Sequence, residues 1–487
     1  MMKRTLALIL AAIMLMATVS CKKDDKKPDS GKSTDNGTET AAETGGENDY
    51  AEIDSYVAEL AKSHQFDGAD FSIIGTGENC IYPTEENITG NLQNDAMYSR
   101  ALELEDKFGI DITFSESTAN GYENTGAETS AKVRLDVSSG GNSYDLIEGH
   151  VSTCGQVLLN AGCLRSVNES DILDFSKSWW LNNLEGQYSI ANQLYFLTGK
   201  INPSHYSDAS CILYNKEVAA NFNLPDMYEL VDSGEWTFDK MTEIASAISG
   251  GDIRRYMIGS GTSLYFGAGY TISEKDEDDN PVIPKTLSAS EINYIDKLSA
   301  VFSDRSMIYD KNLNNKNLDD FYDREVFENG QVLFWFDATW RANDMREYDV
   351  EFGILPIPKE SRDQANYISL SGDRAVYFSK NLKDPEMTEV ITEAMAALSE
   401  KYLEPAFYEK ALKGRSTYDT DSRRVLDILY NSKAIDLALV YNWGELSEVI
   451  SDATVGYNDS YVSSYNSSAR LANNQIKSLL KTVNANK

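Results

Sequence analysis

Apolar and polar residues alternate along the chain with two different periods from about residue 66 onward. Short apolar runs, typical of buried strands, occur at 71–74, 110–114 and 144–147. Between the first two runs the apolar positions recur every three or four residues, on one helix face: Met97, Ala101, Leu104 and Phe108. Asn94 or Asp95 is expected to cap that helix, and Gly109 to end it. Strands joined by helices predict an α/β fold with mostly parallel sheets, whose loops after the strands bind ligands.

The same alternation restarts in the second half of the chain. Further strands are expected at 211–214, 331–336 and 351–355, and helices at 215–222 and after Thr237, which is a plausible cap. The strand 331–336 is expected to lead into a loop that carries Asp337 and Trp340. From about residue 385 the pattern is helical, and the last helix has one apolar stripe: Ala472, Ile476, Leu479 and Val483. Two or three domains or lobes are therefore expected.

The first twenty residues have the layout of a bacterial export signal. Lys3 and Arg4 precede an apolar run at 6–18, which is shorter than the roughly 17 to 25 residues that span a bilayer. Residues 1–20 are therefore predicted to be a signal peptide. Small residues before Cys21 resemble the lipobox of bacterial lipoproteins, although Thr18 departs from the usual leucine. The resemblance implies lipidation of Cys21; ordinary secretion, with Cys21 discarded, is the alternative.

Residues 22–50 are polar and contain almost no large apolar side chain. Such a segment cannot bury enough surface to offset its ordering entropy, so 21–50 is predicted to be the lipidated cysteine followed by a flexible linker. Residues 51–487 are apolar and aromatic enough to form a large folded domain. The expected location is the cell membrane, where a lipid anchor holds the domain on the extracytoplasmic side.

Composition restricts the possible partners. The formal net charge is −33, which repels phosphate backbones and makes nucleic acid and anionic ligands poor partners. Four cysteines follow Cys21, in no usual zinc spacing, and the chain has three histidines. No metal site and no cofactor is therefore expected. Whether the four cysteines pair is left open, with free buried thiols as the default: Cys80, Cys154, Cys163 and Cys211.

Five short segments occur in a characteristic order: 144–150, Tyr-Asn-Lys-Glu at 214–217, Trp-Thr-Phe at 236–238, Phe-Glu-Asn-Gly at 327–330 and Phe-Gly-Ile-Leu-Pro at 352–356. In their order and spacing, residues 66–487 resemble the extracellular solute-binding proteins of carbohydrate ABC importers, the family that includes maltose-binding protein. The resemblance implies a type II periplasmic-binding-protein-like fold, with two discontinuous α/β lobes, a hinge and a ligand cleft. Lobe 1 would comprise about 66–207 and 350–400, and lobe 2 about 208–349 and 401–487.

The function that the resemblance implies is a monomeric, non-enzymatic receptor, which closes around a small carbohydrate and delivers it to the permease subunits of an ABC importer. A neutral sugar has apolar ring faces and a rim of hydroxyls, so its site needs flat aromatics and short polar side chains. The aromatic candidates match family positions: Trp340, Tyr265 and Trp443. The polar candidates lie at strand ends and at the expected crossover, with 148–150 expected as a turn: Glu148, His150, Tyr206, Asp208, Ser371 and Asp373.

Other functions remain possible. A surface-anchored glycosidase needs two carboxylates roughly 5 to 9.5 Å apart, and the many Asp and Glu residues leave that open. No Gly-x-Ser-x-Gly or His-Glu-x-x-His motif occurs, which argues against serine esterases and zinc proteases. A solute-binding protein of the same fold for peptides or other solutes is a further alternative. A predominantly helical glycan-capturing lipoprotein is disfavoured by the strands expected before residue 360.

Overall fold

The computed structural model describes residues 50–75, 91–119, 122–249, 252–311, 320–371, 374–412 and 420–485. The predicted signal peptide, Cys21, residues 22–49 of the predicted linker, Cys80 and Asp373 lie outside the described residues. Within the described ranges, none of the helices combines the length and the apolar character needed to cross a membrane.

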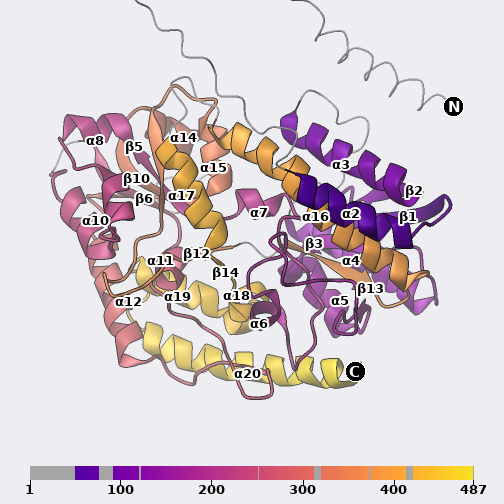
Figure 1. Cartoon of the computed structure of the whole chain (residues 1–487). Helices are drawn as coiled ribbons and strands as arrows, with labels where there is room; N and C mark the ends of the chain where they lie inside the picture. Colours follow the sequence, from indigo (N-terminus) through magenta and orange to yellow (C-terminus); the bar gives the residue numbers. More distant parts are fainter. Residues whose placement is uncertain are drawn as a thin grey trace, which may run out of the picture. The chain divides into compact units, whose positions relative to one another are not determined.

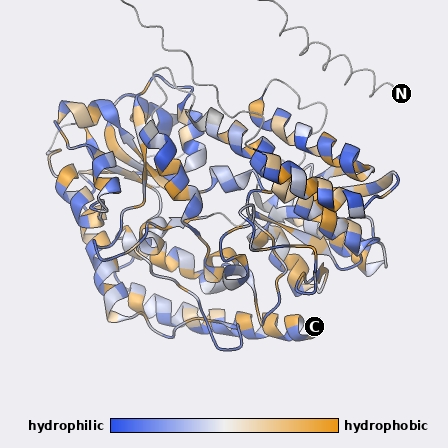
Figure 2. Ribbon diagram, in the orientation of Figure 1, coloured by the Kyte–Doolittle hydropathy of each residue, from blue (hydrophilic) through white to orange (hydrophobic). Residues whose placement is uncertain are grey.

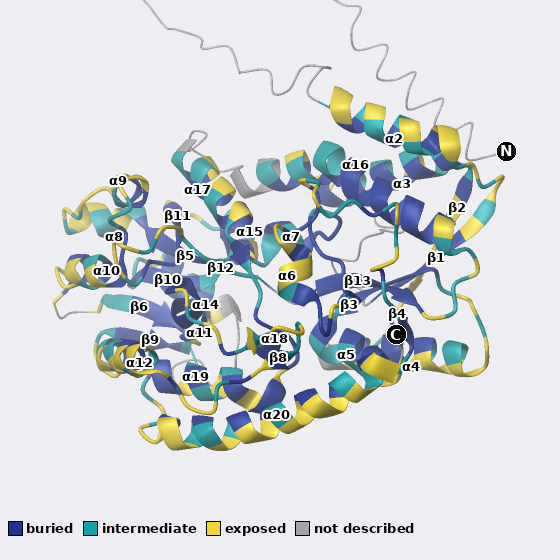
Figure 3. Cartoon of the chain, turned by 60° about the horizontal axis from the view of Figure 1, so that its bottom comes forward, coloured by how far each residue is buried: buried dark blue, intermediate teal, exposed yellow. Residues whose placement is uncertain are grey.

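The first five-stranded sheet belongs to the first lobe. Its strand order is β2 (Ile110–Glu116), β1 (Ala69–Gly75), β3 (Leu146–His150), β13 (Arg374–Ser379) and β4 (Leu164–Arg165). It lies between two groups of helices, which the views in Figures 1 and 3 separate clearly. One group consists of α2 (Ala51–Ser63), α3 (Leu92–Phe108) and α16 (Pro385–Leu412), and the other of α4 (Tyr122–Ser138) and α5 (Gln156–Asn160).

Helix α3 shows why this lobe could be predicted in outline. All four predicted apolar positions are buried, and Gly109 ends the helix in the left-handed conformation at φ 65°. The start of the helix was predicted wrongly, because Asn91 accepts a hydrogen bond from the Gln93 amide at 3.0 Å and begins the helix three residues earlier. The expected turn at 148–150 was also wrong, since these residues extend β3 and pair with β13.

The second five-stranded sheet has the order β11 (Phe352–Pro356), β5 (Ser210–Asn215), β10 (Val332–Ala338), β6 (Arg254–Ile258) and β9 (Ile308–Asp310). The helices of this part of the chain are α8 (Lys216–Asn221), α9 (Met227–Asp232), α10 (Phe238–Ala245), α12 (Ala289–Phe302), α14 (Asp320–Glu328), α15 (Thr339–Met345) and α17 (Thr420–Asn431). The Thr237 cap of α10 is confirmed, because its hydroxyl accepts from the Lys240 amide at 3.3 Å.

Both sheets are mixed, so the prediction of mostly parallel sheets was wrong. In the first sheet β13, which returns from a distant part of the sequence, runs antiparallel to β3 and β4. In the second sheet β5, the first of its strands in the sequence, runs antiparallel to β10 and β11. The expected loop at 337–340 was wrong as well. Asp337 belongs to β10, and Trp340 lies in the first turn of α15.

The remaining elements connect the sheets or cover them. They are η2 (Val151–Gly155), α6 (Leu184–Tyr188), α7 (Ser204–Ser207), α11 (Thr262–Gly267), the hairpin β7 (Glu274–Lys275) and β8 (Pro281–Val282), the parallel pair β12 (Ser369–Leu370) and β14 (Lys433–Ala434), α18 (Leu437–Val440), η3 (Trp443–Glu445), α19 (Leu446–Thr454) and α20 (Tyr461–Ala485). The predicted stripe of α20 is buried, and Figure 2 shows polar and apolar positions alternating along this helix.

Two hydrophobic cores form, one around each sheet. The first core also includes residues of α19 and α20, and β11 at 352–356 belongs to the second sheet. The chain passes from the first sheet to the second between Leu197, which bridges to β13, and the start of β5. Helix α16 contributes residues up to Leu398 to the first core and Phe407 to the second, with Pro405 inside the helix. The exact lobe limits given above stay a prediction.

Candidate functional site

A cleft of about 330 Å³ opens where α7 lies between α3 and α15. The residues that line it come from α3, the end of α7 and the residue after it, α15 and α16: Gln93, Ser207, Asp208, Trp340, Asn343, Asp344 and Phe407. Most of these side chains are polar and short, and two are aromatic. The cleft therefore offers hydrogen-bonding groups beside flat apolar surface.

Trp340 is the most exposed aromatic side chain of the cleft. Its relative exposure is 36%, which is high for an aromatic residue of this protein. Ala338 has an extended backbone and precedes α15, so Trp340 lies in the first turn of the helix. The neighbouring Arg341 guanidinium lies 4.0 Å from the centroid of the Trp340 ring.

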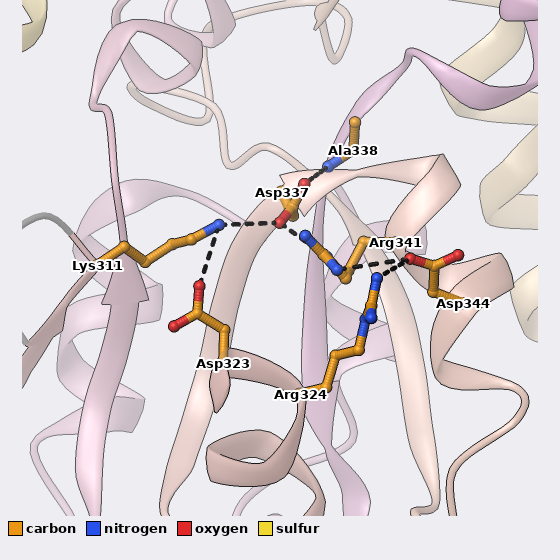
Figure 4. Close-up of polar contacts among 7 residues, drawn as sticks. All are labelled: Lys311, Asp323, Arg324, Asp337, Ala338, Arg341 and Asp344. Carbon is orange, nitrogen blue, oxygen red and sulfur yellow. Dashed lines mark hydrogen bonds and ion pairs between the residues drawn. The ribbon is translucent and has the colours of Figure 1, made fainter. Parts of the chain in front are cut away.

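A network of charged side chains lies at the end of β10 and beside α15 (Figure 4). Oδ2 of Asp337 is 3.2 Å from Nε of Arg341 and 3.5 Å from Nζ of Lys311. Oδ2 of Asp344 is 2.7 Å from Nη2 of Arg324 and 3.5 Å from Nη1 of Arg341. The network contains three cations and three carboxylates: Lys311, Arg324, Arg341, Asp323, Asp337 and Asp344.

Asp208 follows α7 and accepts a hydrogen bond from the Ser207 hydroxyl at 3.0 Å. Burial raises the pKa of the Asp208 carboxyl, while Lys433, Arg374 and His150 oppose that rise because positive charge nearby favours the carboxylate. The Lys433 ammonium donates to the His205 carbonyl, and burial lowers the pKa of Lys433 to about 7. The Asp208 carboxylate, which lines the cleft, and the buried Lys433 ammonium therefore lie near enough for each to favour the charged form of the other.

Glu148 and Arg374 form an ion pair between adjacent strands. Nη1 of Arg374 lies 2.6 Å from Oε1 of Glu148, which is fully buried. His150 lies opposite Arg374 in the pairing of β3 with β13, and its side chain is half-buried. These three residues do not line the cleft, but His150 and Arg374 lie close enough to Asp208 to affect its charge.

Three aromatic candidates lie inside the protein. Tyr206 is buried and stacks on Phe407 with ring centroids 4.9 Å apart. Tyr265 is fully buried and donates to Glu291, and burial raises the pKa of its hydroxyl. Trp443 is buried and stacks on Tyr441, with ring centroids 4.8 Å apart and planes inclined by 16°.

Of the candidate residues, the cleft therefore brings together Asp208 and Trp340. Ser371 lies elsewhere, where its backbone amide donates to the Ala434 carbonyl at 3.0 Å. Sequence reasoning did not single out five lining residues: Gln93, Ser207, Asn343, Asp344 and Phe407. Asn343 and Asp344 could have been found, because they follow Trp340 by three and four positions and share its side of a helix. Gln93 and Phe407 carry no such local signal.

Within the described ranges, no group of three or more His, Cys, Asp or Glu residues is arranged to hold a metal ion. Cys154, Cys163 and Cys211 are buried thiols without a disulfide partner in that same part of the chain. Burial raises the pKa of the Cys154 thiol to about 12, which makes it a poor nucleophile.

Lys433→Met should reveal the titration of the buried lysine. The pKa of Lys433 is lowered from 10.5 to about 7, so between these values the unfolded chain binds a proton that the folded chain does not. The wild-type free energy of unfolding should therefore rise with pH above 7, relative to the variant, by up to about 1.4 kcal/mol per pH unit. Urea unfolding of both proteins at pH 6 to 9 measures this difference. A difference in free energy of unfolding that stays constant with pH would contradict a lowered pKa of Lys433. In an Asp208→Asn background the free energy of unfolding should begin to rise at a lower pH, because the Asp208 charge raises the pKa of Lys433.

Comparison with known proteins supports the architecture. No protein-family model matches the sequence, and no curated protein matches it in sequence. Solved structures do match. The fold is that of the family 1 extracellular solute-binding proteins, including sugar-binding proteins of ABC importers, and the predicted two-lobed α/β class is confirmed.

Three of these structures give the extent of the likeness. An ABC substrate-binding protein from Listeria monocytogenes, in complex with cycloalternan, has a TM-score of 0.55 and 11% identity over 84% of this chain and 100% of that chain. The GacH receptor of Streptomyces glaucescens, solved alone and with acarbose, has a TM-score of 0.52 and 13% identity over 85% and 99%. A family 1 protein from Bifidobacterium longum has a TM-score of 0.53 and 12% identity over 83% and 99%.

Proposed function

We propose that the protein is a lipid-anchored extracytoplasmic receptor that binds an uncharged sugar or oligosaccharide between its two lobes and delivers it to the permease of an ABC importer. The observation that carries the proposal is the composition of the cleft. An exposed tryptophan and Phe407 accompany five short polar side chains, as the ring faces and hydroxyls of a sugar require. The similar solved structures include proteins bound to cycloalternan, raffinose and α-D-tagatose.

The charges around the cleft favour an uncharged ligand. Asp344 is paired with Arg324 and Arg341, and Asp208 lies near Lys433 and Arg374. Because each lining carboxylate already has positive partners on its protein side, neither needs a cationic ligand. Both retain oxygens that can accept hydrogen bonds from hydroxyl groups.

The anchor and the partners are proposed from the sequence and the fold. Cys21, after the signal peptide 1–20, would carry the lipid, and residues 22–50 would link it to the folded domain. Closure of lobes 66–207 with 350–400 and 208–349 with 401–487 would form the surface that the permease recognises. The receptor would act as a monomer and would release its ligand unaltered.

A glycosidase is the second candidate, and one observation favours it. Two carboxylates, Asp208 and Asp344, line the same cleft. Burial raises the pKa of Asp208, as a general acid requires, and the second carboxylate of such a pair would be Asp344, which contacts two arginines.

One screen tests the proposal and separates the two candidates. The folded domain is heated with each member of a panel that contains raffinose, maltotetraose, acarbose, tagatose and cycloalternan. A bound sugar raises Tm, and at one hundred times Kd it adds about 2.7 kcal/mol to the stability. Chromatography then determines whether the sugar is recovered intact, as a receptor requires. No increase in Tm across the panel would contradict a sugar receptor of this kind, and cleaved sugar would favour the glycosidase.

A further inference from the structure

We propose that Arg341 is a positioning residue of the cleft, which holds the Trp340 ring and the Asp344 carboxylate in place for the ligand. This role rests on the proposed sugar-binding function. The guanidinium contacts two indoles and lies 4.0 Å from the centroid of the Trp340 ring and 4.9 Å from that of the Trp335 ring. The same group is 3.2 Å from Asp337 and 3.5 Å from Asp344.

Arg341 cannot itself take part in binding, because only 1% of its side chain is exposed. Its contacts nevertheless reach two lining residues, Trp340 and Asp344. We therefore expect Arg341 to affect the ligand through these two side chains. Trp335, the other indole that it contacts, is completely buried and fixes the inner side of the guanidinium.

The arrangement requires arginine rather than another cation. A guanidinium is planar, so it can lie against an indole face while its edge reaches carboxylates. The ammonium of a lysine can approach either the ring or a carboxylate, but it cannot present a flat face to the ring. Lys311 lies 3.5 Å from Asp337, and Arg324 lies 2.7 Å from Asp344, so each of these carboxylates contacts a second cation besides Arg341 (Figure 4).

An exposed tryptophan would otherwise be free to change its side-chain conformation in solvent. Contact with the guanidinium restricts that freedom before the ligand arrives, which lowers the entropy that binding must remove. Oδ2 of Asp344 accepts hydrogen bonds from both Arg324 and Arg341. These contacts restrict the orientation of the Asp344 carboxylate as well. Arg341 thus prepares an aromatic surface and a hydrogen-bond acceptor together.

The test is ¹⁹F NMR of the full chain labelled with 5-fluorotryptophan, in the absence of any ligand. The chain has six tryptophans, and the signals of Trp340 and Trp335 are identified by their loss in Trp340→Phe and Trp335→Phe. In Arg341→Lys we expect the Trp340 signal to shift and broaden, and the Trp335 signal to shift, while the other four stay in place. Arg341→Gln keeps a planar group without the charge and should also shift the Trp340 signal. This second variant replaces Arg341→Lys in the test if Arg341→Lys does not fold.

A matched control exists in the same lobe. The Arg305 guanidinium lies 4.7 Å from the Tyr457 ring and 2.7 Å from Asp310, and these residues do not line the cleft. Arg305→Lys should leave the Trp340 signal unchanged. A folded Arg341→Lys or Arg341→Gln protein with an unchanged Trp340 signal would overturn the proposal. Because the measurement uses no sugar, a failed sugar screen beside a shifted Trp340 signal would refute the receptor function and not the contact.

Discussion

Replacement of Glu393 by leucine is expected to lower the free energy of unfolding by about 3 to 5 kcal/mol at pH 5. The fully buried Glu393 carboxyl accepts hydrogen bonds from the indoles of Trp179 and Trp180 and from the Tyr56 hydroxyl, each at 3.0 Å. The Asp174 amide adds a fourth donor at 3.4 Å. Leucine would leave the two indole donors buried without an acceptor, and it would also remove the acceptor of the half-buried Tyr56 hydroxyl. Urea unfolding followed by tryptophan fluorescence and circular dichroism measures the loss.

A neighbouring carboxylate provides the control. Glu389 lies one turn earlier on α16, is almost as buried, and accepts one hydrogen bond from the Ser170 hydroxyl at 2.9 Å. Glu389→Leu should therefore cost about 1 kcal/mol, the value of one hydrogen bond. An equal loss in both variants would mean that the indole donors add nothing.

The pH dependence of the Glu393→Leu effect has a definite sign. Burial raises the pKa of Glu393 from 4.5 to about 7, so in this range the folded protein binds a proton that the unfolded chain releases. The stabilisation from this proton is complete below pH 4.5 and is lost as the pH rises through 7. The difference between wild type and variant should therefore narrow between pH 5 and 7, by up to about 1.4 kcal/mol per pH unit.

Trp340→Ala should weaken sugar binding by about 1 to 3 kcal/mol, or about 5-fold to 150-fold in Kd. The substitution removes the exposed aromatic face of the cleft, while the free energy of unfolding should change little because more than a third of the side chain is exposed. Calorimetry with a sugar identified by the panel measures the change. Tyr457→Ala is the control, since this equally exposed ring lies outside the lining residues. Unchanged affinity in Trp340→Ala would remove this ring from the binding site.

The fold could be predicted from sequence wherever a local pattern is sufficient. Short apolar runs gave β1, β2 and β5, and the apolar stripe gave α20, because each depends on neighbours within one element. Residues 148–150 were predicted as a turn, although they form the end of β3, where the Glu148 carboxylate is fully buried. Arg374, more than two hundred residues later, makes that burial possible, and no local pattern reveals such a partner.

In the candidate site, too, some residues could be predicted from a local pattern and others depend on distant parts of the chain. Trp340 could be selected because its position matches that of an aromatic in the family that the sequence resembles, and Asp208 because it lies at the expected crossover between the lobes. Gln93 and Phe407 belong to helices whose pattern looks ordinary, and they reach the cleft only because α3 and α16 pack together across the crossing segment. Trp443 and Tyr265 read like binding aromatics in sequence, and their burial depends on the neighbours Tyr441 and Glu291.

Helix α16 limits how far the two lobes can separate, because one continuous helix belongs to both hydrophobic cores. Before Pro405 it is held to the first lobe, where Lys401 contacts Asp54 at 2.7 Å and Lys200 contacts Glu400 at 2.7 Å. A wide separation of the lobes would have to bend or unfold α16, or remove one of its ends from a hydrophobic core. A proline gives up one backbone hydrogen bond, so flexing costs least beside it. We therefore expect any movement of one lobe relative to the other to be a small rotation, with the bend of α16 close to Pro405.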